Sequence, residues 1–340
     1  MHNKLLEYAK LIRLPGLGGF SMAPIFGAIS LIDIGVYVDL KILILLLLLG
    51  IFKSIYGIVL NDYADIEVDR LSKESEKRPL VKGTISKKNA LLISILSMIG
   101  ILATAFIFFY RNQTPFYLGV LCIILAIIMG TIYDLYGKRI IGSDFLVGGA
   151  EGLFVLVGAF LVSPNVTLSV FTWTTTILIF NQYLFMNAVM GGLKDADHDY
   201  LMNTKNIALS SGVKVYKNNE IFIPMSFKVF ALSIRFLSCF IVFIPFVFLG
   251  AKYELWQILL LMLLVIIVLY LSIKLVNIKT FEWKGKMVKF LGLQGVLWYS
   301  FVPIMLIPVV GLANAFILIL FPLVWYGIFK LTVVKDYFAS

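Results

Sequence analysis

An acidic run directly after an apolar stretch is the feature of this 340-residue sequence that most strongly indicates chemistry. It reads Asn-Asp-Tyr-Ala-Asp-Ile-Glu-Val-Asp from Asn61 to Asp69. If the run is helical, Asn61, Asp65 and Asp69 recur every four residues and Asp62 lies three before Asp65, so their oxygen atoms share one face. Like charges so placed repel, and a divalent cation would turn the repulsion into chelation. Hard carboxylate and amide oxygens suit Mg²⁺, which usually shares its coordination with phosphate.

A second acidic cluster follows another long apolar segment. It reads Lys-Asp-Ala-Asp-His-Asp from Lys194 to Asp199, and it sets Asp195 and Asp199 four residues apart. Two such clusters predict two metal ions. Four apolar segments separate the clusters, and an even number of membrane crossings returns a chain to the same side. Taken alone, each cluster could also be a solvated helix end, but the recurrence of the spacing favours a metal site.

Basic residues accompany both acidic clusters. Arg78 follows the first cluster, Lys138 and Arg139 close the fourth apolar segment, and Lys205 follows the second cluster. Cations and metal-bound carboxylates together suit a diphosphate, because the metal ions neutralise part of its charge and Lys and Arg neutralise the remainder. Such charges would stabilise a leaving group as its bond breaks. Each of these cations could instead be an ordinary basic residue of a cytoplasmic loop.

The elements that must position these residues are membrane-spanning helices. The chain is 61% hydrophobic and only 14% charged, which excludes an ordinary soluble globule. Runs of roughly 20 apolar residues are long enough to span a bilayer as helices. They fall near 15–34, 41–60, 89–110, 115–134, 144–163, 168–193, 228–250, 255–277, 289–309 and 312–330. The last pair is the hardest to divide, so we predict nine or ten spans.

The distribution of basic residues predicts the orientation in the membrane. With the N-terminus inside, only Lys41, Arg111 and Lys252 fall in or beside outer loops, and Lys53 and Arg235 fall within spans. The rest of the 29 Lys and Arg residues then lie in inner loops or at inner span ends, as the positive-inside rule requires. We therefore expect an integral protein of the cell membrane with its N-terminus and both acidic clusters in the cytoplasm. The net charge of +10 indicates anionic membrane lipid as a partner and no nucleic acid.

No linker or low-complexity segment divides the chain, so residues 1–340 are expected to form a single transmembrane domain. The longer polar interruptions are 61–88, 194–227 and 278–288, all on the predicted cytoplasmic side. Irregular backbone at membrane depth is tolerated only beside protein or water. The predicted fold is therefore an all-α polytopic bundle around a central cavity that opens to the cytoplasmic side.

The two acidic motifs resemble those of the UbiA-type intramembrane prenyltransferases, whose patterns are NDxxDxxxD after the second helix and DxxxD after the sixth. The stretch Arg78-Pro79-Leu80, followed by Gly83, resembles the RPLxxG stretch of that family. The segment from Tyr133 to Lys138-Arg139 resembles its Y…KR segment. The resemblance covers most of the chain, and the paired acidic motifs are its most specific part.

The resemblance implies a helical bundle around a cavity, two Mg²⁺ ions, and transfer of an isoprenoid chain from its diphosphate to an acceptor. Residues and resemblance together assign catalysis to Asp62, Asp65, Asp195 and Asp199, metal ligation to these four with Asn61 and Asp69, and diphosphate binding to Asn61, Arg78, Lys138, Arg139 and Lys205. The partners implied are an allylic isoprenyl diphosphate donor and an aromatic or lipid acceptor.

The acceptor is the open question. The spacing of the first motif and the RPLxxG stretch most resembles that of the members that prenylate aromatic quinone precursors such as 4-hydroxybenzoate. Prenylation of geranylgeranylglyceryl phosphate or of haem is the alternative, because those members share the diphosphate machinery. A transporter that binds coupling cations on its acidic motifs is an alternative of a different class. CDP-alcohol phosphotransferases also use paired Asp motifs in a membrane bundle, but their continuous signature is absent from this sequence.

Overall fold

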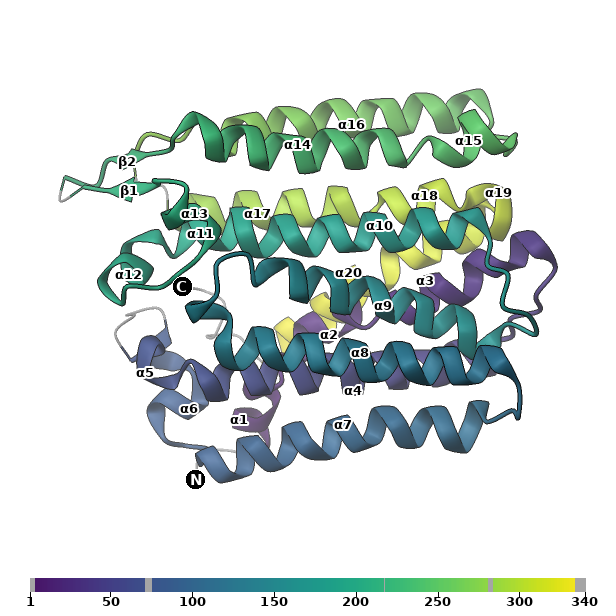
Figure 1. Ribbon diagram of the computed structural model, residues 1–340, viewed down its shortest axis with the longest axis horizontal. Coiled ribbons are helices and arrows are strands. Elements are labelled where there is room, and N and C mark those ends of the chain that lie inside the picture. The colour runs from purple at the N-terminus through teal and green to yellow at the C-terminus, as the bar shows by residue number, and fades with distance from the viewer. Residues whose placement is uncertain (1–3, 71–74, 217, 281–283, 334–340) are drawn as a thin grey trace.

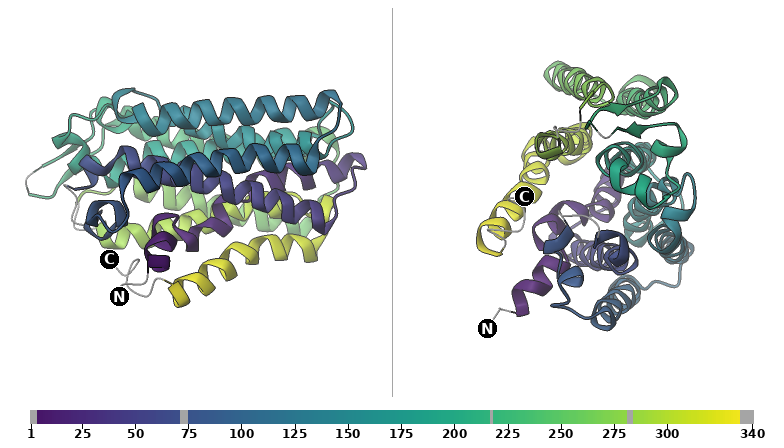
Figure 2. Two further views of the ribbon diagram at one scale, coloured as in Figure 1. Left: turned by 90° about the horizontal axis from the view of Figure 1, so that it is seen from below. Right: turned by 90° about the vertical axis from the view of Figure 1, so that its left-hand side faces the viewer.

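Long helices that run along one common axis dominate the fold (Figure 1, Figure 2). The computed structural model describes residues 4–70, 75–216, 218–280 and 284–333. Within these residues, eight helical segments are long and apolar enough to span a membrane. The predicted all-α transmembrane bundle is confirmed.

The bounds of the elements are as follows. The first half of the chain contains α1 (Lys4–Leu11), α2 (Leu14–Phe20), α3 (Ala23–Ile29), η1 (Ser30–Ile34), α4 (Leu40–Ala64), α5 (Ile66–Asp69), η2 (Ser75–Lys77), α6 (Pro79–Lys82), α7 (Lys87–Phe109), α8 (Thr114–Tyr136), η3 (Gly137–Arg139) and α9 (Asp144–Val162). The second half contains α10 (Val170–Leu184), the π-helix η4 (Phe185–Gly191), α11 (Gly192–Lys194), α12 (Ala196–Leu201), α13 (Ile207–Ser210), β1 (Lys214–Val215), β2 (Ile221–Phe222), α14 (Met225–Ile241), α15 (Ile244–Leu249), α16 (Leu255–Leu275), α17 (Lys284–Tyr299), α18 (Phe301–Met305), α19 (Ile307–Val310) and α20 (Leu312–Val333).

Three of the ten predicted spans are interrupted rather than continuous, and the first of them, 15–34, is divided into α2, α3 and η1. The apolar run 228–250 is divided into α14 and α15, and the run 289–309 is divided into α17 and α18. Each of these two breaks lies just before a proline, Pro245 or Pro303, which lacks the N–H that a continuous helix needs. The two pieces of each pair nevertheless follow one another along the length of the bundle (Figure 1). The expected number of nine or ten crossings is therefore consistent with the fold.

Short polar side chains begin several of the long helices. Asp39 accepts a hydrogen bond from the Ile42 backbone N–H at 2.8 Å at the start of α4. Ser86 accepts one from the Asn89 N–H at 3.2 Å at the start of α7. These caps satisfy donors that the first helical turn leaves without partners.

Both acidic motifs lie at one end of the bundle. The left-hand end in Figure 1 gathers α5, α6, α11, α12 and α13, together with the beginning of α1. An antiparallel pair of two-residue strands, β1 and β2, extends from the same end. This small hairpin was not predicted, because strands of two residues are too short to show the alternation of apolar and polar residues by which a strand is recognised. The prediction that both motifs lie on the same side is confirmed by the fold.

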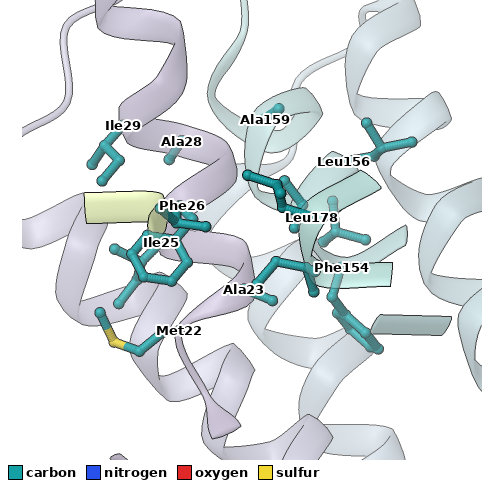
Figure 3. Packing of buried hydrophobic residues seen from close by; sticks show 14 of the residues in the cluster. Met22, Ala23, Ile25, Phe26, Ala28, Ile29, Phe154, Leu156, Ala159 and Leu178 are labelled. Atoms are coloured by element: carbon teal, nitrogen blue, oxygen red, sulfur yellow. The ribbon is translucent and has the colours of Figure 1, made fainter. Parts of the chain in front are cut away.

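One closely packed part of the core lies where α3 crosses α9. Figure 3 shows Ala23 and Phe26 of α3 beside Phe154 and Ala159 of α9. A Cβ atom added at Gly158 would lie only 1.8 Å from the Pro24 carbonyl oxygen. The two helices therefore meet backbone to backbone, as small residues allow in membrane bundles. This crossing fixes α9, which contributes to the walls of both cavities described below.

Candidate active site

A polar cavity of about 310 Å³ lies between the two acidic motifs. Five of the six predicted metal ligands line it, namely Asn61, Asp65, Asp69, Asp195 and Asp199. The fold thus brings together side chains that are more than 120 residues apart in the sequence. The juxtaposition follows from the crossings between the motifs, which return the chain to the same end of the bundle.

The first acidic run is interrupted at Asp65 rather than continuously helical. Helix α4 ends at Ala64 and α5 begins at Ile66, with Asp65 between them. The Asp65 N–H still donates to the Asn61 carbonyl at 3.0 Å, and the Asp69 N–H donates to the Asp65 carbonyl at 2.8 Å. The four-residue spacing therefore survives the break, and Asn61, Asp65 and Asp69 all reach the cavity wall.

Asp62 differs from the other predicted ligands because it does not line the cavity. Its side chain is only 3% exposed. The Arg13 guanidinium donates to its carboxylate at 2.7 Å, and Arg78 contacts the same oxygen at 3.3 Å. In this arrangement Asp62 anchors two arginines at the cavity edge. Its predicted role as a metal ligand stays a prediction.

The second motif follows a π-helical turn. Segment η4 widens the helix immediately before α11, so the residues after it are presented on a different face than an uninterrupted α10 would give. Asp195 lies between α11 and α12, and its N–H donates to the Gly191 carbonyl at 2.9 Å. The Asp199 carboxylate accepts a hydrogen bond from the Asn206 side chain at 2.7 Å.

Cations are paired with the acids around the cavity. Lys138 in η3 contacts the Asp65 carboxylate at 3.0 Å, and Lys194 contacts Asp195 at 3.5 Å. Arg78 also pairs with the Asp69 carboxylate. Arg13, Arg78, Lys138 and Lys194 all line the cavity.

Two predicted diphosphate ligands lie away from this cluster. The Arg139 and Lys205 side chains are exposed and are absent from the cavity wall. The backbone N–H of Lys205 donates to the Lys138 carbonyl at 2.8 Å, so the loop that carries it supports Lys138. Because adjacent residues on a turn point in different directions, Lys138 reaches the cavity while Arg139 faces outward. We therefore leave Arg139 and Lys205 out of the proposed site.

Burial of acids around the cavity disfavours their charged forms. Burial raises the pKa of Asp65 above its ordinary value, and the nearby Lys138 ammonium only partly opposes this effect. Burial also raises the pKa of Asp199, with a further increase from the Asp195 carboxylate. A bound cation would reverse both effects by favouring the ionised carboxylates.

The prediction of site residues missed several cavity-lining groups. Arg13, Asp134, Asn187 and Asn206 line the cavity, and the Tyr133 hydroxyl donates to the Asn187 side chain at 3.1 Å. Asp134 is hydrogen-bonded to the Asn61 side chain. A usable signal was present, because Asp134 and Asn187 are polar residues within or at the end of apolar spans, where such residues are commonly functional.

A second cavity of about 190 Å³ continues into the bundle. It shares Arg13, Asn61, Tyr133, Asp134 and Asn187 with the first cavity, so the two cavities adjoin at these side chains. The inner walls come mainly from α4, α8 and α9, with Tyr183 and Met186 from the following spans. A Cβ atom added at Gly57 or Gly130 would meet no atom within 4 Å, so both glycines face open space. We call this second cavity the inner chamber.

The residues of the outer cavity fit a Mg²⁺ ion that is completed by a bound substrate. Among the side chains that the structure describes, no three His, Cys, Asp or Glu residues converge closely enough to hold an ion on their own. Mg²⁺ usually binds through one or two carboxylates, substrate phosphates and water rather than through an all-protein cage. Four carboxylates and one amide that line this cavity supply suitable oxygen ligands. The chemistry of this donor set therefore fits the predicted metal.

The sequence is similar to digeranylgeranylglyceryl phosphate synthases and protoheme IX farnesyltransferases. Digeranylgeranylglyceryl phosphate synthase of Saccharolobus solfataricus is 28% identical over 269 residues, which cover 72% of this chain and 86% of the relative. Protoheme IX farnesyltransferase of Paenarthrobacter aurescens is 29% identical over 133 residues, which cover 37% of this chain and 40% of that protein.

Solved structures share the fold. A digeranylgeranylglyceryl phosphate synthase structure aligns with a TM-score of 0.62 at 19% identity, covering 91% of this chain and 99% of the other. A UbiA homologue from Archaeoglobus fulgidus bound to GPP and Mg²⁺ aligns with a TM-score of 0.58 at 18% identity, covering 87% of this chain and 99% of the other. The model of the UbiA prenyltransferase family matches residues 21–293. The chain therefore belongs to the UbiA prenyltransferase family.

Proposed function

We propose that this protein transfers an isoprenyl group from an allylic diphosphate to a lipid acceptor in a Mg²⁺-dependent reaction. The observation that carries the proposal is the pair of adjoining cavities: acids and cations line the outer cavity, and the inner chamber lies beside it within the bundle. A diphosphate fits the outer part, and its isoprenyl chain fits the apolar interior. The Archaeoglobus fulgidus homologue, whose structure holds GPP and Mg²⁺, supports this assignment.

The acceptor we propose is geranylgeranylglyceryl phosphate, which presents an aliphatic hydroxyl. The relatives support this choice over 4-hydroxybenzoate, the acceptor favoured by the motif spacing. Similarity to the Saccharolobus solfataricus synthase extends over 86% of that enzyme, whereas similarity to the haem farnesyltransferase extends over only 40%. The diphosphate-binding motifs are shared by members with different acceptors, which is why their spacing is a poor guide to the acceptor.

The acidic residues of the outer cavity would hold the metal. Asn61, Asp65, Asp69, Asp195 and Asp199 are the proposed ligands. When bound, Mg²⁺ supplies positive charge that stabilises the diphosphate as a leaving group. We keep Asp62 as an arginine anchor, because two guanidinium groups already contact its carboxylate.

The cations at the cavity change partners in this proposal. Lys138 and Arg78 pair with the carboxylates of Asp65 and Asp69 in the structure. If these carboxylates held Mg²⁺, both cations would be available to phosphate oxygens, where Arg can bind in a bidentate manner. The positive charge is thus already in place around the leaving group and needs little rearrangement during the reaction.

The inner chamber protects the reactive isoprenyl carbon from water. Its walls include aromatic side chains such as Phe154, Tyr133 and Tyr183. Exclusion of water prevents hydrolysis of a reactive allylic cation. Aromatic faces also stabilise a nearby positive charge.

The chain is an integral membrane protein, and we propose the cell membrane as its location with both acidic motifs in the cytoplasm. The excess of Lys and Arg at the motif end supports this orientation. We also propose that residues 1–340 act as one unit. Helix α20 lies beyond the matched family region, yet its Trp325 side chain donates to the Leu14 carbonyl at 2.9 Å.

The function can be tested with purified protein, Mg²⁺ and geranylgeranyl diphosphate. Four acceptors should be offered separately: geranylgeranylglyceryl phosphate, 4-hydroxybenzoate, a naphthoate and haem B. We expect a single prenylated product, from geranylgeranylglyceryl phosphate, identified by mass and dependent on Mg²⁺. A product from another acceptor would overturn the acceptor assignment. Donor binding without Mg²⁺ and without any product would contradict the proposed reaction and favour a transporter.

Two arginines provide a matched test of the diphosphate site. Arg78→Ala is expected to raise the KM for the donor by about tenfold or more, because a charge-assisted hydrogen bond contributes roughly 1.5–3 kcal/mol. Arg139→Ala removes the same charge from an exposed position outside the cavity and should leave the donor KM within about twofold of wild type. Steady-state kinetics with varied donor would measure both values. Equal effects of the two substitutions would contradict our assignment.

A further inference from the structure

A buried ion pair faces the inner chamber, where an isoprenoid chain alone would require only apolar walls. The Lys53 ammonium donates to both carboxylate oxygens of Glu151, at 2.7 and 2.6 Å, and to the Phe20 carbonyl at 2.9 Å. Tyr183 also hydrogen-bonds to Glu151. Lys53 and Glu151 both line the chamber. The family-defining motifs described above include neither residue.

The pair lies deeper in the bundle than the proposed metal ligands. Lys53 precedes Asn61 by eight residues on α4, a rise of about 12 Å along the helix. Glu151 follows Asp144 by seven residues on α9, a rise of about 10 Å. Because the diphosphate is expected beside the acids, the reacting carbon and the attacking acceptor lie on the inner side of it. Glu151 is therefore on the side from which the acceptor must attack.

The proposed reaction releases a proton in this chamber. When the oxygen of an acceptor hydroxyl forms a bond to the isoprenyl carbon, the hydroxyl proton must leave. Of the carboxylates that line the inner chamber, Asp134 is hydrogen-bonded to Asn61 at the metal end. Glu151 is the remaining one among the residues described around this space. Lys53 uses all three of its donors on Glu151 and Phe20, which holds the carboxylate in a fixed position.

We propose that Glu151 accepts the proton of the acceptor hydroxyl and that Lys53 is the positioning residue that orients it. This inference rests on the proposed transfer to a hydroxyl acceptor. In the step, the bond between the isoprenyl carbon and the diphosphate oxygen breaks, and its electron pair leaves with the diphosphate. The bond between the acceptor oxygen and the isoprenyl carbon forms, and the hydroxyl proton moves to a Glu151 carboxylate oxygen.

The decisive variant is Glu151→Gln, which keeps the shape of the side chain and one oxygen for Lys53 but removes the base. We expect about a 10²-fold loss of kcat with the hydroxyl acceptor, while the donor KM and Mg²⁺-dependent donor binding stay near wild type. An acceptor analogue with a thiol in place of the reacting hydroxyl should largely restore turnover at pH 8.5, because a thiol ionises without help from a base. Glu151→Asp, which keeps a carboxylate, should recover part of the hydroxyl activity.

Controls separate this role from a structural one. Glu254→Gln makes the same change at an exposed residue before α16 and should leave kcat unchanged. The double variant Lys53→Met with Glu151→Met replaces the pair by apolar groups of similar volume, a change that is often neutral or stabilising for a buried ion pair. It should fold and bind the donor but lose transfer to the hydroxyl.

The experiment separates a failure of this inference from a failure of the proposed function. Wild-type transfer to the hydroxyl acceptor tests the function first, and only the variants test the role of Glu151. Equal losses with the hydroxyl and thiol acceptors, or an unchanged kcat in Glu151→Gln, would overturn the inference. A double variant that transfers to the hydroxyl at the wild-type rate would do the same.

Discussion

Replacement of Asp65 or Asp195 by asparagine is expected to lower kcat by roughly 10²- to 10³-fold, the loss typical of removing one preorganised electrostatic group. One residue comes from each acidic motif, and both line the outer cavity. Asparagine keeps the size of the side chain but removes the negative charge that a divalent cation needs. The measurement is Mg²⁺-dependent formation of the prenylated product by each purified variant. The Mg²⁺ concentration for half-maximal activity should also rise.

Glu67→Gln is the matched control for this prediction. Glu67 belongs to the same acidic run, but its side chain is exposed and contacts Arg70 at 3.3 Å and Lys87 at 3.4 Å. Surface ion pairs of this kind contribute little, so activity should stay within about twofold of wild type. Near-normal turnover in both Asp65→Asn and Asp195→Asn would contradict metal binding by the two motifs. A loss in Glu67→Gln as large as in the other variants would indicate that the run acts through its total charge alone.

The sequence predicted the bundle and the meeting of the two motifs because both depend on long, simple patterns. Apolar runs of bilayer length identify spans. The even number of spans between Asp65 and Asp195 places the two residues at the same end of the bundle. The four-residue spacing also survives the local break at Asp65, because the backbone hydrogen bonds continue across it. Such features need no knowledge of which helix packs on which.

Side-chain direction around the site was less predictable. Asp62 is adjacent to Asn61 in the sequence, yet only Asn61 lines the cavity. The reason is tertiary, since Arg13 reaches Asp62 from the first helical segment, 49 residues away. Lys138 and Arg139 differ in the same way, because the short η3 turn directs one inward and the other outward. The sequence shows that polar and charged residues lie at the ends of the spans, but it does not show which way their side chains point.

The inner chamber was hidden for a related reason. Lys53 was recognised as a charged residue within a span, but its partner Glu151 is 98 residues away on another helix. Only the packing of α4 against α9 brings their side chains together. An unpaired charge at membrane depth costs free energy. A charged residue within a span is therefore a reason to look for a partner of opposite charge. Identification of that partner requires the fold.

Gly158→Ala is expected to destabilise the folded bundle strongly. The added Cβ atom would lie 1.8 Å from the Pro24 carbonyl oxygen, and backbone atoms on both helices prevent it from being accommodated by a side-chain movement. The helices α3 and α9 must separate, at a cost of about 1–3 kcal/mol or more for overpacking, with loss of contacts in the core shown in Figure 3. Thermal unfolding in detergent, followed by size-exclusion chromatography, would measure the lower melting temperature.

Gly27→Ala should give the same result from the other side of the crossing, since a Cβ atom there would lie 1.8 Å from the Val155 carbonyl oxygen. Gly327→Ala in α20 is the matched control, because an added Cβ atom would meet no atom within 4 Å. A wild-type melting temperature for Gly158→Ala would show that α3 and α9 do not pack this closely. Because α9 also carries Glu151, separation of these helices should displace the carboxylate from the inner chamber. Any Gly158→Ala protein that remains folded is therefore expected to bind the diphosphate donor nearly as well as wild type. Its rate of isoprenyl transfer should be lower.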